Sequence, residues 1–163
     1  MLDRITPARA ATIIALVALA TITGAWIFEA FGYLPCELCL KQRIAYYIGM
    51  PLAALTALVV IKSTSLARAL FLACAFLWLG SALFGAYHAG IEWGFWPGPT
   101  GCTGALARAD SMADFLKQLE TTKVVRCDAV AIRILGLSLA GWNAVISAAM
   151  TALAFIGARR ALS

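Results

Sequence analysis

The chain has 163 residues, of which 63% are hydrophobic and 13% are charged, and its formal net charge is +5. A typical soluble domain is about 45–50% apolar and about 25% charged, so a soluble chain of this composition would expose large apolar patches and aggregate. The composition therefore excludes an ordinary cytosolic domain, a disordered chain and a nucleic-acid-binding protein. The length predicts a single domain.

Four apolar stretches are each long enough to cross a bilayer core, which takes about 20 residues in a helix. They cover residues 10–28, 44–61, 69–87 and 134–157. Pro51 lies inside the second stretch, where neighbouring helices can compensate for the missing hydrogen bond. The sequence predicts an all-α membrane protein whose one domain, residues 1–163, is a bundle of four transmembrane helices.

The basic residues predict how this bundle is oriented. Segments 1–9, 62–68 and 158–163 together carry six basic residues and one acidic residue, whereas segments 29–43 and 88–133 carry seven of each. An excess of Lys and Arg beside the spans marks the cytoplasmic side of a membrane protein. We therefore expect both termini in the cytoplasm and two loops, 29–43 and 88–133, on the opposite side.

Four of the five cysteines lie in these two loops. Cys36 and Cys39 are in the first loop and Cys102 and Cys127 in the second, whereas Cys74 lies inside the third span. In a bacterium that compartment is oxidising, so paired thiols there are expected to form disulfides. The spacing favours Cys36 with Cys39 and Cys102 with Cys127, and Cys74 is interpreted as a small buried hydrophobe.

The first cysteine pair precedes the second span directly. Pro is favoured at the first position of a helix, so we expect Pro35 to open this helix and to put Cys36 and Cys39 in its first turn. Free backbone N–H groups and the positive end of the helix dipole favour a thiolate there. The pattern is typical of a reactive cysteine pair.

Arg43 is predicted to lie on the same helix face as the two cysteines, because positions 36, 39 and 43 are spaced i, i+3 and i+7. A guanidinium at this depth is costly unless an anionic or hydrogen-bonding group meets it. The Cys39 thiolate and the carbonyl oxygens of a lipid-soluble quinone are the two candidates. The side chains that follow are expected to line a flat apolar slot: Tyr46, Tyr47 and Met50.

Simpler interpretations of these residues stay open. The Cys-x-x-Cys pair is compatible with a structural disulfide, or with half of a zinc site completed by Cys102 and Cys127. Arg43 is compatible with an anchor that reaches the membrane surface. His88 is a candidate donor to a quinone oxygen, or a plain interfacial histidine.

The second loop is predicted to expose Cys102. Residues 97–101 combine proline and glycine and exclude both a helix and a central strand. Beyond them, Ser111 and Asp114 resemble a helix cap. Apolar residues then follow at helical spacing: Met112, Phe115, Leu116 and Leu119. We expect a short amphipathic helix here, either on the membrane surface or packed on the bundle.

These motifs together resemble the DsbB family, the bacterial inner-membrane quinone reductases that reoxidise the periplasmic thiol oxidase DsbA. The most specific match is Pro-Cys-x-x-Cys-x-x-Gln-Arg at residues 35–43, at the head of the second span. Cys127-Asp128, the run Leu-Gly-Leu-Ser at 135–138 and Trp142 are similar to the family's approach to its fourth helix. The resemblance covers essentially the whole chain.

The resemblance implies a role for each loop cysteine. Cys102 is similar to the family cysteine that forms a mixed disulfide with DsbA, and Cys127 is similar to its loop partner. Cys36 is similar to the relay cysteine, and Cys39 to the cysteine that contacts the quinone. A DsbA-like thioredoxin-fold oxidase in the periplasm is thus the implied partner. Electrons would then reach the membrane pool of ubiquinone or menaquinone, with no metal involved.

The resemblance also implies a set of residues that bind the quinone. Arg43 is similar to the family's quinone arginine. The other predicted cofactor-binding residues are Cys39, Gln42, Tyr47 and His88. At Gln42 some members carry Glu, and residues 103–126 match only in general character.

Three other functions are weighed against this one. A DsbI-like paralogue with a dedicated partner would look much the same in sequence. A vitamin K epoxide reductase-like enzyme has the helix-borne Cys-x-x-Cys after the loop pair, which is the opposite order. A non-catalytic four-span scaffold with two structural disulfides would not need Arg43 beneath Cys39.

Overall fold

The computed structural model describes residues 5–99, 111–113, 116 and 125–162. Four long helices dominate it: α1 (Pro7–Ala30), α2 (Glu37–Val59), α3 (Thr64–Glu92) and α5 (Leu139–Arg160). Each predicted span corresponds to one of these helices, and all but the last are longer than predicted at their N-terminal ends. The polar residues that flank an apolar stretch thus continue the helix beyond it.

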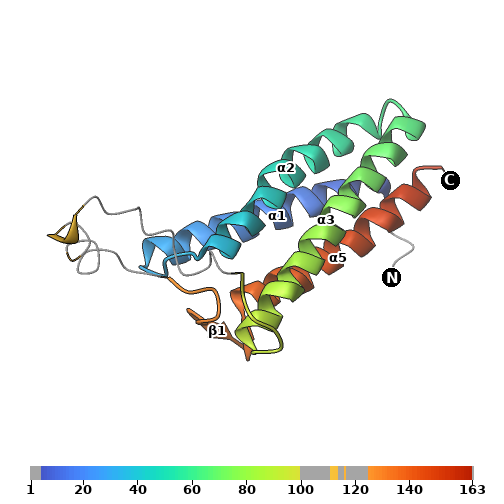
Figure 1. The fold of residues 1–163 in the computed structure, drawn as a ribbon. Helices are drawn as coiled ribbons and strands as arrows, with labels where there is room; N and C mark the ends of the chain where they lie inside the picture. The colour runs from blue at the N-terminus through green and yellow to red at the C-terminus, as the bar shows by residue number, and fades with distance from the viewer. Residues whose placement is uncertain (1–4, 100–110, 114–115, 117–124, 163) are drawn as a thin grey trace.

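The four helices pack as a bundle (Figure 1). α3 lies against α5, α1 against α2, α2 against α3, and α1 against α5. The start of α1, the α2–α3 connection and the end of α5 all lie at one end of the bundle. The Arg160 guanidinium donates to the Ile5 carbonyl over 2.7 Å and joins the two chain ends there.

Hydroxyl residues define where three of the helices begin. Thr6, Ser63 and Ser138 cap α1, α3 and α5, and each accepts a hydrogen bond from the backbone N–H three residues later. Such caps satisfy backbone donors that a helix leaves free in its first turn.

Small residues let the helices approach closely around two large side chains. Phe71 and Trp78 are fully buried in the core that the four helices share. A Cβ added to Gly157 would lie 2.4 Å from the Phe71 ring, and one added to Gly49 would lie 2.4 Å from the Trp78 ring. These glycines accommodate the rings, as expected for helices that pack in lipid.

We therefore expect Gly49→Ala to destabilise the bundle by about 1–3 kcal/mol, because the added Cβ would overlap the fully buried Trp78 ring. Gly80→Ala is the matched control, since a Cβ there meets nothing within 4 Å. Alanine is the better helix former, so the control should be neutral or slightly stabilising. Thermal unfolding in detergent measures both, and equal melting temperatures would contradict this account of the packing.

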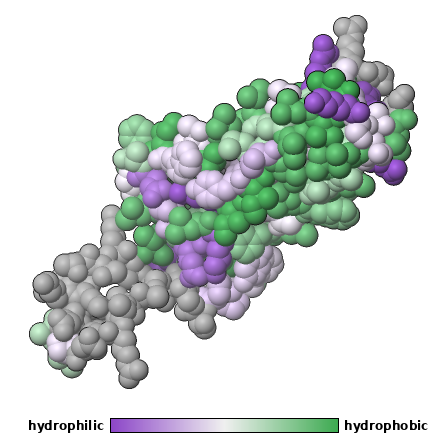
Figure 2. All heavy atoms as spheres, turned by 90° about the horizontal axis from the view of Figure 1, so that it is seen from above, coloured by the Kyte–Doolittle hydropathy of each residue, from purple (hydrophilic) through white to green (hydrophobic). Residues whose placement is uncertain are grey.

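The outer surface of the bundle is largely apolar, as Figure 2 shows for one face. Leucines and phenylalanines project from all four helices, for example Leu16, Leu58, Phe76 and Phe155. α1, α3 and α5 are long and apolar enough to cross a membrane. α2 is equally long, but its first two turns carry charged and polar side chains.

The predicted fourth span is wrong at its beginning. Residues 133–138 form a hairpin of β1 (Arg133–Ile134) and β2 (Leu137–Ser138), paired antiparallel, before α5 starts. Leu135 and Gly136 turn the chain with φ of +52° and +85°. Two consecutive positive φ angles are what a two-residue hairpin turn needs, and glycine provides one of them at no steric cost. The predicted interfacial helix after Ser111 lies mostly outside the described residues.

Candidate functional site

The start of α2 holds the two cysteines of the Cys-x-x-Cys motif. Cys36 is the N-cap of the helix, and its sulfur accepts the Cys39 backbone N–H over 3.3 Å. The helix itself begins at Glu37. The prediction that Pro35 opens the helix is therefore wrong by two positions, because the Cys36 sulfur takes the place of a capping hydroxyl.

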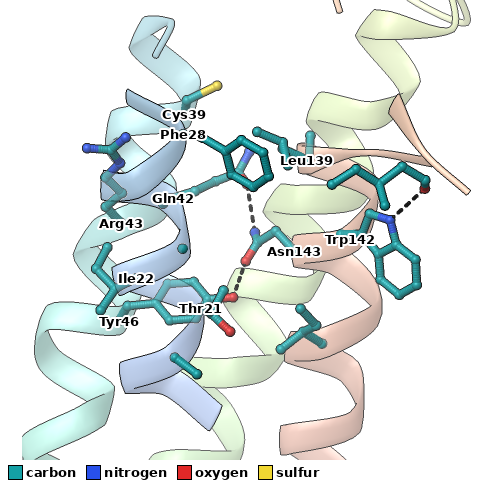
Figure 3. Close-up of a pocket in the computed structure, with 16 residues that line it drawn as sticks. Thr21, Ile22, Phe28, Cys39, Gln42, Arg43, Tyr46, Leu139, Trp142 and Asn143 are labelled. Atoms are coloured by element: carbon teal, nitrogen blue, oxygen red, sulfur yellow. Dashed lines mark hydrogen bonds between the residues drawn. The ribbon is translucent and has the colours of Figure 1, made fainter. Parts of the chain in front are cut away.

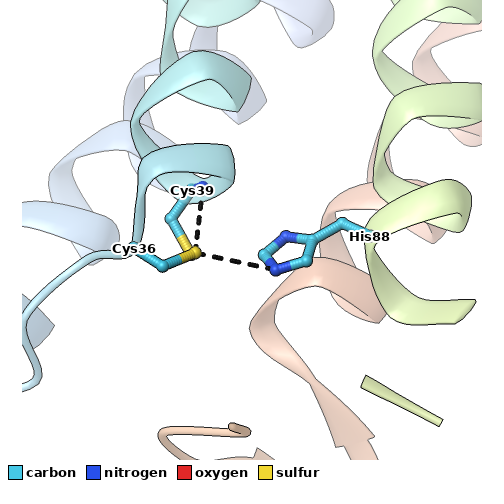
Figure 4. Close-up of side chains that lie close together, drawn as sticks. All are labelled: Cys36, Cys39 and His88. Carbon is cyan, nitrogen blue, oxygen red and sulfur yellow. Dashed lines mark hydrogen bonds between the residues drawn. The ribbon is translucent and has the colours of Figure 1, made fainter. Parts of the chain in front are cut away.

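Three donors converge on the Cys36 sulfur. It lies 2.8 Å from Cys39 Sγ and 3.6 Å from Nε2 of His88, in addition to the Cys39 backbone N–H (Figure 4). The hydrogen bond from the Cys39 thiol lowers the pKa of Cys36 well below its usual value; burial opposes this shift, and His88 and the Cys39 N–H assist it. These contacts favour the thiolate form of Cys36, which is the nucleophilic form.

A cysteine of the second loop lies close to this pair. Cys127 belongs to the same buried apolar cluster as Cys36, Leu38 and Ile91, and Cys39 packs against that cluster. Cys127 takes part in a disulfide, whereas Cys36 and Cys39 are free thiols. Cys102, its predicted partner, lies outside the described residues.

A cavity of about 440 Å³ begins at Cys39 and extends between α1, α2 and α5 (Figure 3). This volume is within the usual range for small-molecule sites. Most of the lining is aliphatic or aromatic. Four side chains from one face of α2 form a more polar wall of the cavity: Cys39, Gln42, Arg43 and Tyr46. Asn143 of α5 faces them.

Arg43 lines this cavity and is paired with an acid on the neighbouring helix. Its Nη1 lies 2.6 Å from Oε2 of Glu29, near the end of α1, and the Arg43 side chain is only 12% exposed. The sequence interpretation anticipated that this guanidinium needs a partner, and named a thiolate or a quinone. It missed Glu29, since no local pattern joins residues on two different helices.

Two predicted cofactor-binding residues lie outside the lining of this cavity. Tyr47 is half-exposed, and its hydroxyl accepts a hydrogen bond from Trp26 over 3.3 Å. One residue step turns a helix by about 100°, so it is Tyr46 that faces the cavity. His88 is fully buried beside Cys36 and lines a separate small cleft next to the two sulfurs.

A family-level comparison of the sequence matches residues 7–157 to the disulfide bond formation protein DsbB family. The chain belongs to the DsbB family. It is also 28% identical over 147 residues to an uncharacterized protein of Rickettsia prowazekii (strain Madrid E), which covers 88% of this chain and 80% of that protein. No solved structure is significantly similar to it.

As a member of the DsbB family with long apolar helices, the chain is a membrane protein that acts in disulfide bond formation. Its general activity is that of a disulfide oxidoreductase. The paired thiols of Cys36 and Cys39 agree with that chemistry, because thiol–disulfide exchange requires a thiolate with a second sulfur in reach. Cys74 is fully buried in α3 as part of the bundle core, in keeping with its interpretation as a hydrophobe.

The same residues offer a possible set of metal ligands in this DsbB-family protein. Cys36 Sγ, Cys39 Sγ and a ring nitrogen of His88 lie within 4.8 Å of one another. However, Nε2 of His88 is also 3.2 Å from the Cys127 carbonyl oxygen, which can only accept. A nitrogen that donates a proton has no lone pair for a metal, so this arrangement favours thiol chemistry.

The sequence interpretation did not identify Asn143. It is the single strongly polar side chain in an apolar stretch of α5, and it is buried. Polar side chains inside a membrane span are costly and therefore usually have a function. That isolation was the sequence signal that could have revealed it.

Proposed function

We propose that this DsbB-family protein is a quinone-dependent oxidoreductase that reoxidises a periplasmic DsbA-like thiol oxidase. Electrons would pass from the partner to Cys102 and Cys127, then to Cys36 and Cys39, and finally to a membrane quinone. One observation carries this proposal: Cys39 touches the Cys36 sulfur on one side and borders the cavity with Arg43 on the other.

The cavity fits a quinone head group in shape and chemistry. Its wall is mostly apolar, as a hydrophobic ring requires, and Arg43 supplies a cationic donor for a carbonyl oxygen. A bound quinone would accept two electrons and two protons. The chain's part is to form the bond between the two sulfurs: as Cys36 and Cys39 become a disulfide, they release two electrons and the one proton that the Cys39 thiol carries, and the second proton for the quinone would come from its surroundings.

Cys36 is the better nucleophile of the pair, since it accepts the hydrogen bonds whereas Cys39 donates one. Its thiolate favours closure of the Cys36–Cys39 disulfide once an oxidant takes up the electron pair, which a bound quinone would do. One sulfur of the pair must then exchange with the second loop. Cys127 in the same apolar cluster supports a direct exchange between the two pairs, because exchange requires contact between sulfurs.

We also propose that all four helices span the membrane with both chain ends in the cytoplasm. The end of the bundle where α1 starts and α5 ends carries Arg9, Arg159 and Arg160, and the α2–α3 connection there carries Lys62. This matches the distribution of positive charge expected at a cytoplasmic face. The thiol pair and Cys127 lie toward the opposite end, and would then face the periplasm.

Two alternatives make different predictions. A DsbI-like paralogue would carry out the same chemistry with a dedicated partner, so only the identity of the donor separates it. A scaffold with structural disulfides would have no use for a lowered thiol pKa at Cys36 beside a cavity. The geometry of the pair thus favours catalysis over a purely structural role.

The purified protein is expected to reduce ubiquinone or menaquinone when a reduced DsbA-like oxidase is supplied, with one quinone consumed per disulfide formed. Loss of the quinone absorbance measures this, and an alkylated partner is the control. In cells, Cys127→Ala should leave Cys102 in a covalent complex with the partner, whereas Cys102→Ala should not. A scaffold would consume no quinone and hold no partner in either variant.

A further inference from the structure

Four buried polar side chains form a hydrogen-bonded chain between the cavity and the sulfur pair: Tyr46, Asn143, Gln42 and His88. The Tyr46 hydroxyl donates to Asn143 Oδ1 over 2.5 Å, and Asn143 Nδ2 donates to Gln42 Oε1 over 2.7 Å. Nε2 of Gln42 lies 2.7 Å from Nδ1 of His88. At most 7% of any of these residues is exposed, so protein groups must satisfy their hydrogen bonds.

This chain has one direction. The Asn143 side-chain oxygen accepts a hydrogen bond from Tyr46, so the Asn143 amide nitrogen faces Gln42. This nitrogen donates to the Gln42 side-chain oxygen. Only the Gln42 NH₂ group is then left for His88, and an NH₂ group can only donate. With the two amides in this orientation, Nδ1 of His88 is the acceptor and carries no proton.

The other side of the imidazole leads to the same tautomer independently. Nε2 of His88 lies 3.2 Å from the Cys127 carbonyl oxygen and 3.6 Å from Cys36 Sγ. A carbonyl oxygen can only accept, so Nε2 must carry the proton. Which ring nitrogen is protonated is set by the partner of the other nitrogen.

We propose that Gln42 and Asn143 are positioning residues that hold His88 with its proton on Nε2, so that the imidazole donates toward Cys36. Gln42 is then not a direct quinone ligand, although it borders the cavity. The proposal concerns the thiol pair alone, and it holds whether or not the cavity binds a quinone.

The tautomer matters for the charge on Cys36. With its proton on Nε2, His88 adds a donor to a sulfur that already accepts two hydrogen bonds from Cys39. With the proton on Nδ1, a nitrogen lone pair would face the sulfur, which would disfavour the thiolate and complete a set of metal ligands. Gln42 and Asn143 would thus favour the thiolate form of Cys36.

The sole histidine of the chain makes a direct test possible. In protein labelled with ¹⁵N-histidine, every ring signal belongs to His88. We expect a protonated Nε2 and an unprotonated Nδ1 at neutral pH, without quinone or partner. A protonated Nδ1 in the wild-type protein would overturn the proposal.

Gln42→Glu tests the role of the amide. A carboxylate can only accept, and imidazole is more basic than a carboxylate, so Nδ1 should become protonated. Tyr47→Phe is the control, since Tyr47 lies next to Tyr46 outside the hydrogen-bonded chain, and it should leave the His88 signals unchanged. An unprotonated Nδ1 in Gln42→Glu would show that Gln42 does not set the tautomer.

A pH titration of thiolate absorbance provides the second readout. His88→Ala should raise the midpoint of Cys36 ionisation by about one pH unit, and an unchanged midpoint would overturn the donor role. Cys36→Ser provides the baseline, because it shows the absorbance change that does not come from the Cys36 thiolate. The other charged or titratable groups around Cys36 are Cys39 on α2, Glu92 on α3, and Arg126 and Arg133 before α5. This measurement needs no turnover, so it stays informative if the quinone proposal fails.

Discussion

Cys39→Ser is expected to abolish quinone reduction, with turnover lowered by at least about 10³-fold, as is typical when a reacting nucleophile is removed. Among the described residues, Cys39 is the one sulfur that both contacts Cys36 and borders the cavity. A serine there fills the same space but cannot form a disulfide. No other free thiol of the described residues can substitute, because Cys74 lies in the core of the bundle.

The loss can be separated from misfolding. Cys74→Ser replaces another buried free thiol away from the site, and it should keep turnover. Cys39→Ser should also still form a mixed disulfide through Cys36 with the second loop or the partner, whereas Cys36→Ser should not. Stopped turnover with retained trapping assigns Cys39 to the last transfer. Retained turnover in Cys39→Ser would remove Cys39 from the mechanism.

The apolar pattern predicted the four helices, because a bilayer-length run of hydrophobic residues has few other structures available. It predicted their ends less well. The run from Ile134 to Leu137 is apolar and was assigned to a helix, but Leu135 and Gly136 take positive φ angles and form a hairpin. Composition does not distinguish an apolar turn from the first turn of a span.

The candidate site also contains contacts that the sequence predicts and contacts that it does not. Local spacing correctly brought Cys36 and Cys39 together at the start of a helix and placed Arg43 near Cys39. The partners on other helices were not predictable, since they depend on how helices rotate against one another. Glu29 beside Arg43 and Asn143 beside Gln42 are both contacts of this kind. The sequence predicts both Tyr46 and Tyr47 beside the slot and Tyr47 as a cofactor-binding residue, but the rotation of α2 decides which of two adjacent tyrosines faces the cavity, and it is Tyr46.

Arg43→Ala is expected to raise the apparent KM for quinone by roughly 10–100-fold, which corresponds to the loss of one hydrogen bond from a charged group. The thiol chemistry between Cys36 and Cys39 remains, so kcat should fall much less. Steady-state kinetics with quinone as the varied substrate separate the two constants. Lys41→Ala is the matched control: Lys41 lies half-exposed on the same helix, pairs with Glu37, and is not among the residues that line this cavity.

Glu29 complicates this result, because Arg43→Ala leaves its carboxylate without the ion pair that it has in the wild type. An unpaired anion near the cavity would itself repel an electron-rich ring oxygen. The double variant Arg43→Ala/Glu29→Gln removes that charge. If the KM stays raised in the double variant, the guanidinium binds the quinone directly. If the double variant instead has the wild-type KM, Arg43 serves only to join α1 to α2. The same conclusion follows if Arg43→Ala alone leaves the KM unchanged.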